Sequence, residues 1–178
     1  AGFLGLGQVV MFYDANDIQL STVVDDVTSE DTAMKYKAWG WHVLTIDGND
    51  HAAIRQAIQA GINEEARPTL IIGKTVMGKG VVLEDGTGYE GEVELHGKPL
   101  GESNASFAKT VEHLGGDPAN PFQIFPEVAS YYQAVVAEKC KSAAQRRHAF
   151  QQWAQQNPAP ATKLQGFWER KLPDLDWA

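Results

Sequence analysis

The sequence predicts an α/β protein with a doubly wound, mostly parallel sheet flanked by helices and followed by a helical C-terminal segment. Short apolar segments alternate with segments of helical period along the first part of the chain. Polar loops containing Asp follow the first two apolar segments, as expected where a strand leaves a sheet. This alternation is typical of β-α-β units, whose strands lie parallel in one sheet.

Three segments are predicted to be strands. Residues 9–13 form a continuous apolar run that ends at Asp14, so we expect a buried strand. Residues 42–46 form a second strand, which ends before Asp47. Residues 69–72 are expected to form a third buried strand, which continues for a few residues beyond this run.

Two helices are predicted between these strands. Residues 29–39 form a short helix, with Thr28 and Asp31 in a capping arrangement and Gly40 at its end. The second helix begins after Asp50, which can cap it, and ends before the third strand. One face of the second helix carries an apolar stripe of Ala53, Ile54, Ala57, Ile58 and Ile62.

After the third strand the sequence no longer alternates between strand-like and helical segments. Residues 78–101 are rich in glycine and lack a helical period, so we expect a long loop of the kind that is often functional or mobile. A helix is predicted over residues 102–114, a long helix over residues 126–156, and a short helix that runs through residue 168. The single cysteine, Cys140, lies on the apolar stripe of the long helix, where we expect a core position rather than a catalytic one.

The composition argues against several classes of protein. The chain has 178 residues, with 15 Lys and Arg against 23 Asp and Glu, and no basic stripe that would bind a nucleic acid. No apolar run approaches the roughly 20 residues of a membrane span, so no membrane association is expected. One cysteine cannot form an internal disulfide, which makes a cytoplasmic location the expectation.

The loop after the first strand is a candidate metal site. Asn16 and Ile18 lie just past the carboxyl end of that strand, where ligands bind in doubly wound sheets. A side-chain amide oxygen and a backbone carbonyl suit Mg²⁺ or Ca²⁺, and such an ion could hold a diphosphate. The alternative is that Asn16 and Asp17 form only a turn, which is the commoner role of these residue types.

Two further segments could take part in chemistry. Gly78 and Gly80 would let the backbone approach a ligand closely, although a strand-exit turn is the commoner reason for such glycines and the Walker spacing is absent. His96 precedes Gly97 in the long loop and could move protons, or it could be a surface histidine before a turn. The chain has no Gly-x-Ser-x-Gly segment, so a hydrolase nucleophile elbow is not indicated.

Taken in order, these segments resemble transketolase. The resemblance rests on residues 14–18, 30–36, 38–43, 68–70, 74–78 and 96–101. It is strong from residue 1 to about residue 116 and remains collinear to the end of the chain. The resemblance implies the thiamine-diphosphate-binding fold, in which residues 14–18 form the second half of a motif that opens with Gly-Asp-Gly.

The resemblance also implies a role for five residues. Asn16 would bind the divalent metal, Mg²⁺ or Ca²⁺, through its side chain, and Ile18 would bind it through its backbone carbonyl. Leu20 would line the thiazole region of thiamine diphosphate, and Met77 would lie against the cofactor, where the family more often has Ile. His96 would contact the diphosphate and the reacting sugar hydroxyl, and it would act as the catalytic proton carrier.

The implied organisation is that of a partial enzyme. Residues 1–116 would be the downstream half of the diphosphate- and metal-binding domain, residues 117–171 its helical extension, and residues 172–178 the start of a linker. The expected partners are the upstream Gly-Asp-Gly half, the pyrimidine-binding domain and the C-terminal domain, within a parent homodimer that acts on sugar phosphates. The chain alone is expected to show no turnover and only feeble cofactor binding.

The implied activity is transfer of a two-carbon ketol group from a ketose phosphate to an aldose phosphate in the pentose phosphate pathway. One alternative is another thiamine-diphosphate enzyme, such as a deoxyxylulose-phosphate synthase or a 2-oxo-acid dehydrogenase subunit. The segment from His96 to Leu100 favours transketolase over both. The other alternative is a non-catalytic domain that serves only in assembly or binding.

Overall fold

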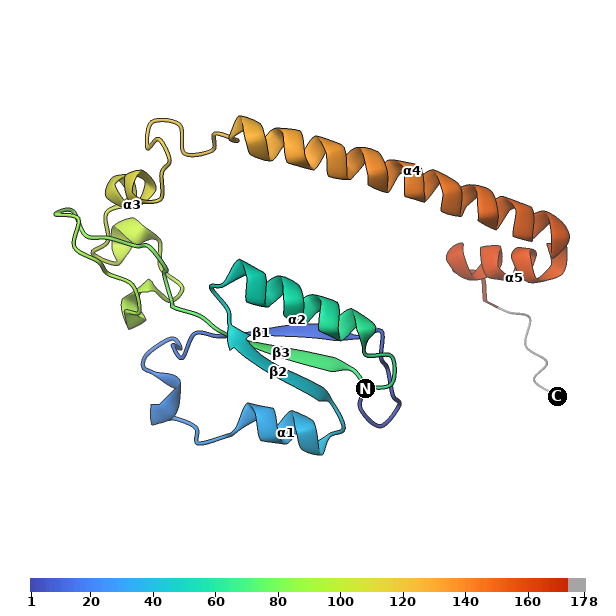
Figure 1. Cartoon of the computed structure of the whole chain (residues 1–178), viewed down its shortest axis with the longest axis horizontal. Helices are drawn as coiled ribbons and strands as arrows, with labels where there is room; N and C mark the ends of the chain where they lie inside the picture. Colours follow the sequence, from blue (N-terminus) through green and yellow to red (C-terminus); the bar gives the residue numbers. More distant parts are fainter. Residues whose placement is uncertain (173–178) are drawn as a thin grey trace. The chain divides into compact units, whose positions relative to one another are not determined.

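The computed structural model describes residues 1–172, and its first part has the predicted α/β order (Figure 1). The strands are β1 (Val10–Ala15), β2 (His42–Asp47) and β3 (Thr69–Lys74). The α-helices are α1 (Thr32–Ala38), α2 (His51–Asn63), α3 (Phe107–His113), α4 (Pro126–Gln156) and α5 (Pro158–Trp168). Three short 3-10 helices are η1 (Val24–Asp26), η2 (Val93–Leu95) and η3 (Leu100–Glu102).

The sheet has the order β1-β3-β2, and both pairings are parallel. Val10 of β1 and His42 of β2 both lie opposite Thr69 of β3, so the three strands start level with one another. Their carboxyl ends therefore leave the same edge of the sheet. The predicted parallel α/β sheet is confirmed.

The helices α1 and α2 cover opposite faces of this sheet (Figure 1). On one face, Leu70 and Ile72 of β3 pack with Ala33 and Tyr36 of α1. On the other face, α2 approaches so closely that a Cβ atom on Gly61 would lie 3.1 Å from both methyl groups of Val10. Alternate residues of β3 thus point to α1 and α2, which explains why this central strand is buried along most of its length.

The first strand differs from its prediction as a buried element. Ala15 is its one buried residue, while the side chains of Phe12 and Tyr13 are 42% and 40% exposed. In the part of the chain that the structure describes, β1 pairs only with β3 and so forms an edge of the sheet. Its apolar composition suits a central strand, but no neighbour covers its outer side within residues 1–172.

Two helix starts differ from the prediction because a different polar side chain caps each helix. The side chain of Asp31 accepts a hydrogen bond from Met34 N–H, so α1 begins at Thr32 rather than near residue 29. The helix predicted over residues 102–114 begins only at Phe107, as α3, because Ser106 caps it by accepting from Lys109 N–H. The Asp50 cap predicted for α2 and the bounds predicted for α4 are confirmed.

The chain forms two compact units, of which the first is Ala1–Pro121 and the second begins at Phe122. In the second unit, α5 packs on the end of α4, with the ring centroids of Phe150 and Trp168 5.4 Å apart. Cys140 is exposed, contrary to its predicted core position, because α4 buries no residue within this unit. Among residues 1–172, no helix is long and apolar enough to cross a membrane.

The predicted domain boundaries at residues 116 and 171 stay predictions. The predicted linker over residues 172–178 lies, apart from its first residue, outside the described residues.

The exits of β2 and β3 approach so closely at Gly48 that no side chain fits there. A Cβ atom at this position would lie 2.5 Å from Thr75 Cγ2 and 2.9 Å from the carbonyl carbon of Gly73. Gly48→Ala is therefore expected to lower the free energy of unfolding by about 1–3 kcal/mol, because backbone atoms must move apart. Urea unfolding measures this change, and Gly88→Ala is the control because its Cβ would meet no atom within 4 Å. Equal stabilities of the two variants would contradict the close approach.

Candidate functional site

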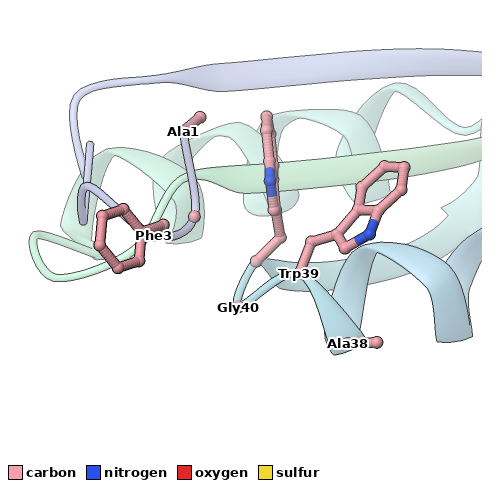
Figure 2. Close-up of a pocket in the computed structure, with 7 residues that line it drawn as sticks. Ala1, Phe3, Ala38, Trp39 and Gly40 are labelled. Carbon is pink, nitrogen blue, oxygen red and sulfur yellow. The ribbon is translucent and has the colours of Figure 1, made fainter.

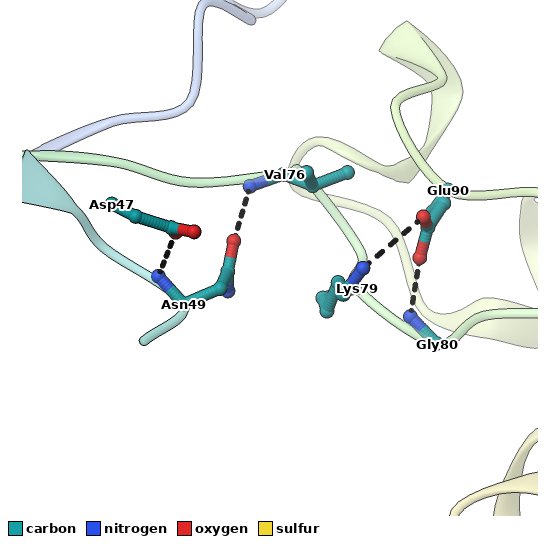
Figure 3. Close-up of polar contacts among 6 residues, drawn as sticks. All are labelled: Asp47, Asn49, Val76, Lys79, Gly80 and Glu90. Carbon is teal, nitrogen blue, oxygen red and sulfur yellow. Dashed lines mark hydrogen bonds and ion pairs between the residues drawn. The ribbon is translucent and has the colours of Figure 1, made fainter. Parts of the chain in front are cut away.

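The carboxyl ends of the three strands form the candidate site, and side chains cross-link their exit loops. The hydroxyl of Thr75, after β3, donates to the carboxylate of Asp14 in β1. Lys74 Nζ lies 3.2 Å from Asp17 Oδ1, which joins the end of β3 to the loop after β1. Val76 N–H donates to Asn49 Oδ1 at 3.2 Å and thereby joins the exits of β3 and β2 (Figure 3). The three loops thus hold one another at a single sheet edge.

The Asn16–Ile18 loop, which carries the predicted metal ligands, contains a tight turn. Ile18 N–H donates to Asn16 Oδ1 at 3.1 Å, and Asp17 between them has a positive φ of 61°. Asp and Asn tolerate this left-handed backbone better than most residues. Within residues 1–172 the carbonyl oxygen of Ile18 accepts no hydrogen bond, so it keeps both lone pairs for a ligand.

The two predicted ligands of this loop would be a minority of those that a hard divalent cation needs. Mg²⁺ and Ca²⁺ take about six to eight oxygen ligands. Asn16 and Ile18 offer two, and the described residues contain no group of three or more His, Cys, Asp or Glu that could hold a metal. The donor type fits Mg²⁺ or Ca²⁺, while the remaining ligands must come from a diphosphate, water or another segment.

A small apolar cluster brings Met77 and His96 together although 18 residues lie between them. Val81, Leu95 and Ala105 form its buried centre, and Met77 packs against it. Leu95 lies against the backbone of Gly78, where a Cβ atom would come within 2.4 Å of Leu95 Cδ1. Because His96 directly follows Leu95, this packing fixes the histidine backbone next to the turn that carries Met77.

Leu20, in the loop after β1, also lies close to the segment that contains His96. A Cβ atom on Gly97 would be 3.9 Å from Leu20 Cδ2, so the loop after β1 contacts the residue that follows His96. The side chain of Leu20 is 80% exposed, which leaves its apolar surface open to a ligand or a partner. The structure thus brings Leu20, Met77 and His96 into one region beside the strand exits.

The imidazole of His96 has a buried nitrogen without a protein partner. Its Nδ1 is inaccessible to solvent and makes no hydrogen bond within the described part of the chain, whereas the backbone N–H donates to Val93 O at 3.0 Å. A buried polar atom that lacks a partner destabilises the fold, and in native proteins such an atom is explained by strain, by a catalytic role, or by a bound water or ion. The described residues therefore leave the hydrogen-bonding capacity of His96 Nδ1 unused.

Two cavities open near the strand exits. One of about 300 Å³ lies beside Asp17 and the start of α1, and carboxylates dominate its charged lining. Another, of about 590 Å³, lies along the ends of β2 and β3 and includes Lys74 and Lys79. None of the five predicted site residues lines either cavity.

A hollow of about 570 Å³ lies at the amino ends of the strands, away from these residues (Figure 2). Phe3, Trp39 and Gly40 line it, and Trp39 packs against Tyr36 with ring centroids 5.1 Å apart. Its lining has no His, Asp, Glu, Lys or Arg, so it lacks the groups that a diphosphate or metal site needs.

A comparison of the sequence with known protein families shows the family of this chain. A model of the family described as "Transketolase, thiamine diphosphate binding domain" matches residues 1–173. The chain belongs to the transketolase family. It is 36% identical over 174 residues to transketolase 1 of Vibrio cholerae, an alignment that covers 97% of this chain and 25% of that protein. It is 38% identical over 135 residues to transketolase 2 of Xanthobacter flavus, which covers 75% of this chain and 18% of that protein.

Crystal structures of transketolases have the same fold. The complex of the Pichia stipitis transketolase with sedoheptulose-7-phosphate matches with a TM-score of 0.84 and 29% identity, over 98% of this chain and 25% of that chain. This chain therefore spans about a quarter or less of the length of these transketolases. The family resemblance and the fold predicted from the motifs are confirmed, whereas the roles of the five site residues stay predictions.

Several residues that join the loops of the candidate site were not predicted from the sequence. Asn49 had a detectable signal, because it follows a predicted strand within an Asp-Gly-Asn-Asp segment. Thr75 follows β3 and Asp14 lies near the end of β1, but only the register of β1 against β3 brings them into contact. Glu90 carries no sequence signal, since it lies in a glycine-rich loop among several other acidic residues.

The cluster around Leu95 should control the mobility of the Met77–His96 region. Leu95→Ala is expected to remove about 2–4 kcal/mol of packing free energy from this cluster while leaving the sheet intact. Hydrogen exchange measures the effect residue by residue, and the amides of Val81 and Tyr89 should exchange faster while that of Ile71 does not. The exposed Val27 supplies the control Val27→Ala, which should change none of these rates. Unchanged exchange in Leu95→Ala would contradict the role of the cluster.

Proposed function

We propose that this chain forms part of the thiamine-diphosphate and metal site of a ketol-transferring transketolase. The reaction moves a two-carbon ketol group from a ketose phosphate to an aldose phosphate, as in the pentose phosphate pathway. The observation that carries the proposal is the buried Nδ1 of His96, which has no partner among residues 1–172 and lies in the loop that also carries Met77. A family model for thiamine diphosphate binding supports it over the same residues.

Asn16 and Ile18 would hold Mg²⁺ or Ca²⁺ at the end of β1. Their oxygens are of the hard type that these ions prefer, and the turn at Asp17 brings the two residues together. The metal would neutralise the diphosphate of the cofactor. Asp14 and Thr75 would keep this loop in register with the exit of β3 through their mutual hydrogen bond.

Leu20, Met77 and His96 would face the cofactor and the substrate. The apolar side chains of Leu20 and Met77 would exclude water from the thiazole region, and the flexible Met side chain can fill the space of an Ile. His96 would hydrogen-bond the diphosphate and move a proton at the reacting sugar hydroxyl. Thiamine diphosphate supplies the nucleophilic carbon for the transfer.

The complete enzyme would need further segments. Two protein ligands are too few for the metal, and this chain covers a quarter of the length of Vibrio cholerae transketolase 1. The proposed partners are the upstream Gly-Asp-Gly half, the pyrimidine-binding domain and the C-terminal domain, which assemble into a homodimer in the cytoplasm and act on sugar phosphates. The exposed edge of β1 supports a neighbouring strand from such a partner.

Complementation tests this proposal. The chain is mixed with the missing transketolase segments, thiamine diphosphate and Mg²⁺, and ketol transfer between sugar phosphates is followed. We expect transfer in the mixture and none with the chain alone, since the chain lacks most of the metal ligands. His96→Ala should lower kcat by about 10²–10⁴-fold, the usual contribution of a proton-transferring side chain.

A control variant is His148→Ala, because this exposed histidine lies in α4 and makes no predicted contact with the site. Its mixture should transfer at the wild-type rate. Formation of a stable complex without transfer at any cofactor concentration would instead identify a non-catalytic assembly module. Equal rates for the two histidine variants would contradict the role of His96.

A further inference from the structure

Side chains outside the predicted site hold the Met77 turn from both sides. Val76 N–H, just before Met77, donates to Asn49 Oδ1 at 3.2 Å, and Asn49 N–H donates to Asp47 Oδ1 at 2.9 Å (Figure 3). Gly80 N–H, three residues after Met77, donates to Glu90 Oε2 at 2.9 Å. The turn is therefore tied to β2 on one side and to the distal part of the loop on the other.

Glu90 binds the turn through both oxygens. While Oε2 accepts from Gly80 N–H, Oε1 lies 3.4 Å from the ammonium of Lys79 (Figure 3). The next residue adds a backbone link, because Gly91 N–H donates to the carbonyl of Met77 at 2.7 Å. Two consecutive residues, 90 and 91, thus fix both the start and the end of the Met77–Gly80 segment.

The loop returns to the turn by way of a short antiparallel contact. Val82 and Gly88 form an antiparallel bridge, and Tyr89 N–H donates to Val81 O at 2.8 Å. Gly80 and Gly91 have positive φ values of 82° and 84°, which side chains would disfavour at these positions. The backbone path therefore places Glu90, and no other carboxylate of the loop, opposite Gly80 N–H.

The carboxylate form of Glu90 is the one that fits this arrangement. The hydrogen bond from Gly80 N–H and then the Lys79 ammonium hold the pKa of the Glu90 carboxyl below its ordinary value of 4.5. A group whose pKa is lowered in the folded state stabilises that state above its ordinary pKa, and this contribution is lost as the pH falls through the lowered value. At neutral pH the charged acceptor is fully present.

We propose that Glu90 is a positioning residue for the cofactor: its carboxylate locks the Gly78–Gly80 turn so that Met77 keeps its place against thiamine diphosphate. The inference rests on the proposed function of Met77 and adds a residue to it. Met77 is held by the hydrogen bond from Gly91 N–H to its carbonyl oxygen and by packing against the cluster around Leu95. The amide of Gly80, at the end of the turn, has the Glu90 carboxylate as its acceptor. Without Glu90 the turn would sample other backbone conformations, and the cofactor would have to restore the native one on binding.

Binding of thiamine diphosphate to the complemented enzyme tests this inference. Calorimetry compares the wild type with Glu90→Ala, which removes the acceptor, and with Glu90→Gln, which keeps one neutral acceptor. We expect Glu90→Ala to raise the Kd for thiamine diphosphate about tenfold, which is the scale of a lost hydrogen bond to a charged group. Glu90→Gln should recover most of the affinity, and kcat at saturating cofactor should stay within about twofold of the wild type in both variants.

The matched control is Glu92→Ala. Glu92 lies two residues away in the same loop and is exposed, and its side chain makes no hydrogen bond within residues 1–172. Its Kd should equal that of the wild type. The midpoint of urea unfolding is measured for each variant, because a purely structural role of Glu90 would lower this midpoint without a selective change in Kd.

The outcomes separate this inference from the proposed function. An equal Kd for thiamine diphosphate in Glu90→Ala and Glu92→Ala would overturn the role of Glu90. A second contradicting result would be a Glu90→Ala variant with a lower urea midpoint and a lower kcat at saturating cofactor, because that pattern indicates a purely structural role. Cofactor binding by the wild type without ketol transfer would contradict the proposed reaction, while the comparison of Kd values would still decide the role of Glu90. Failure of the wild-type mixture to bind thiamine diphosphate would overturn both.

Discussion

The parallel pairing of β1 and β2 along the two sides of β3 is the constraint on which the candidate site depends. Parallel strands leave a sheet at one edge, so the loops that contain Asn16, Asn49 and Met77 emerge side by side. The hydrogen bond between Thr75 and Asp14 and that between Val76 and Asn49 then fix the spacing of these loops. A slip in the register of either pair would turn the polar exit residues to the opposite face.

A second level of organisation lies in the glycine-rich loop after β3. This segment has little regular secondary structure, yet its buried centre of Val81, Leu95 and Ala105 packs Met77 and orders the chain around His96. The sheet supplies one part of the site and the loop supplies the other. They are joined through β3, whose end leads directly into the Met77 turn, and through the contact between Leu20 and Gly97. The candidate site is therefore built from the edge of a sheet and from a loop with its own small core.

The sequence was sufficient to predict the elements whose signals are local. The apolar run at Thr69–Ile72 predicted β3, and Asp50 before an amphipathic stripe predicted the start of α2. The exposure of β1 could not be predicted, because its residues are as apolar as those of a buried strand and exposure depends on which neighbours are present. The start of α1 was misplaced because Thr28 and Asp31 can both cap a helix, and only the backbone conformation selects Asp31.

The same distinction applies to the site. Family motifs predicted that Asn16, Ile18, Leu20, Met77 and His96 act together, and the structure places Met77, His96 and Leu20 in one region. The residues that position these site residues were not predicted, because they contact partners that are distant in the sequence. Glu90 reaches Gly80 only because the loop reverses its direction at the Val82–Gly88 bridge. The amino-acid composition of the loop does not predict where such a reversal occurs.

The most direct test of the central claim is the position of the bound cation. Crystals of the complemented enzyme grown with thiamine diphosphate and Mn²⁺, a probe for the magnesium site, would locate the ion by its anomalous scattering. The account predicts a single ion at the carboxyl edge of the sheet, about 2.0–2.6 Å from Asn16 Oδ1 and from the carbonyl oxygen of Ile18. An ion that neither oxygen coordinates, or one bound at the amino edge of the sheet, would contradict it.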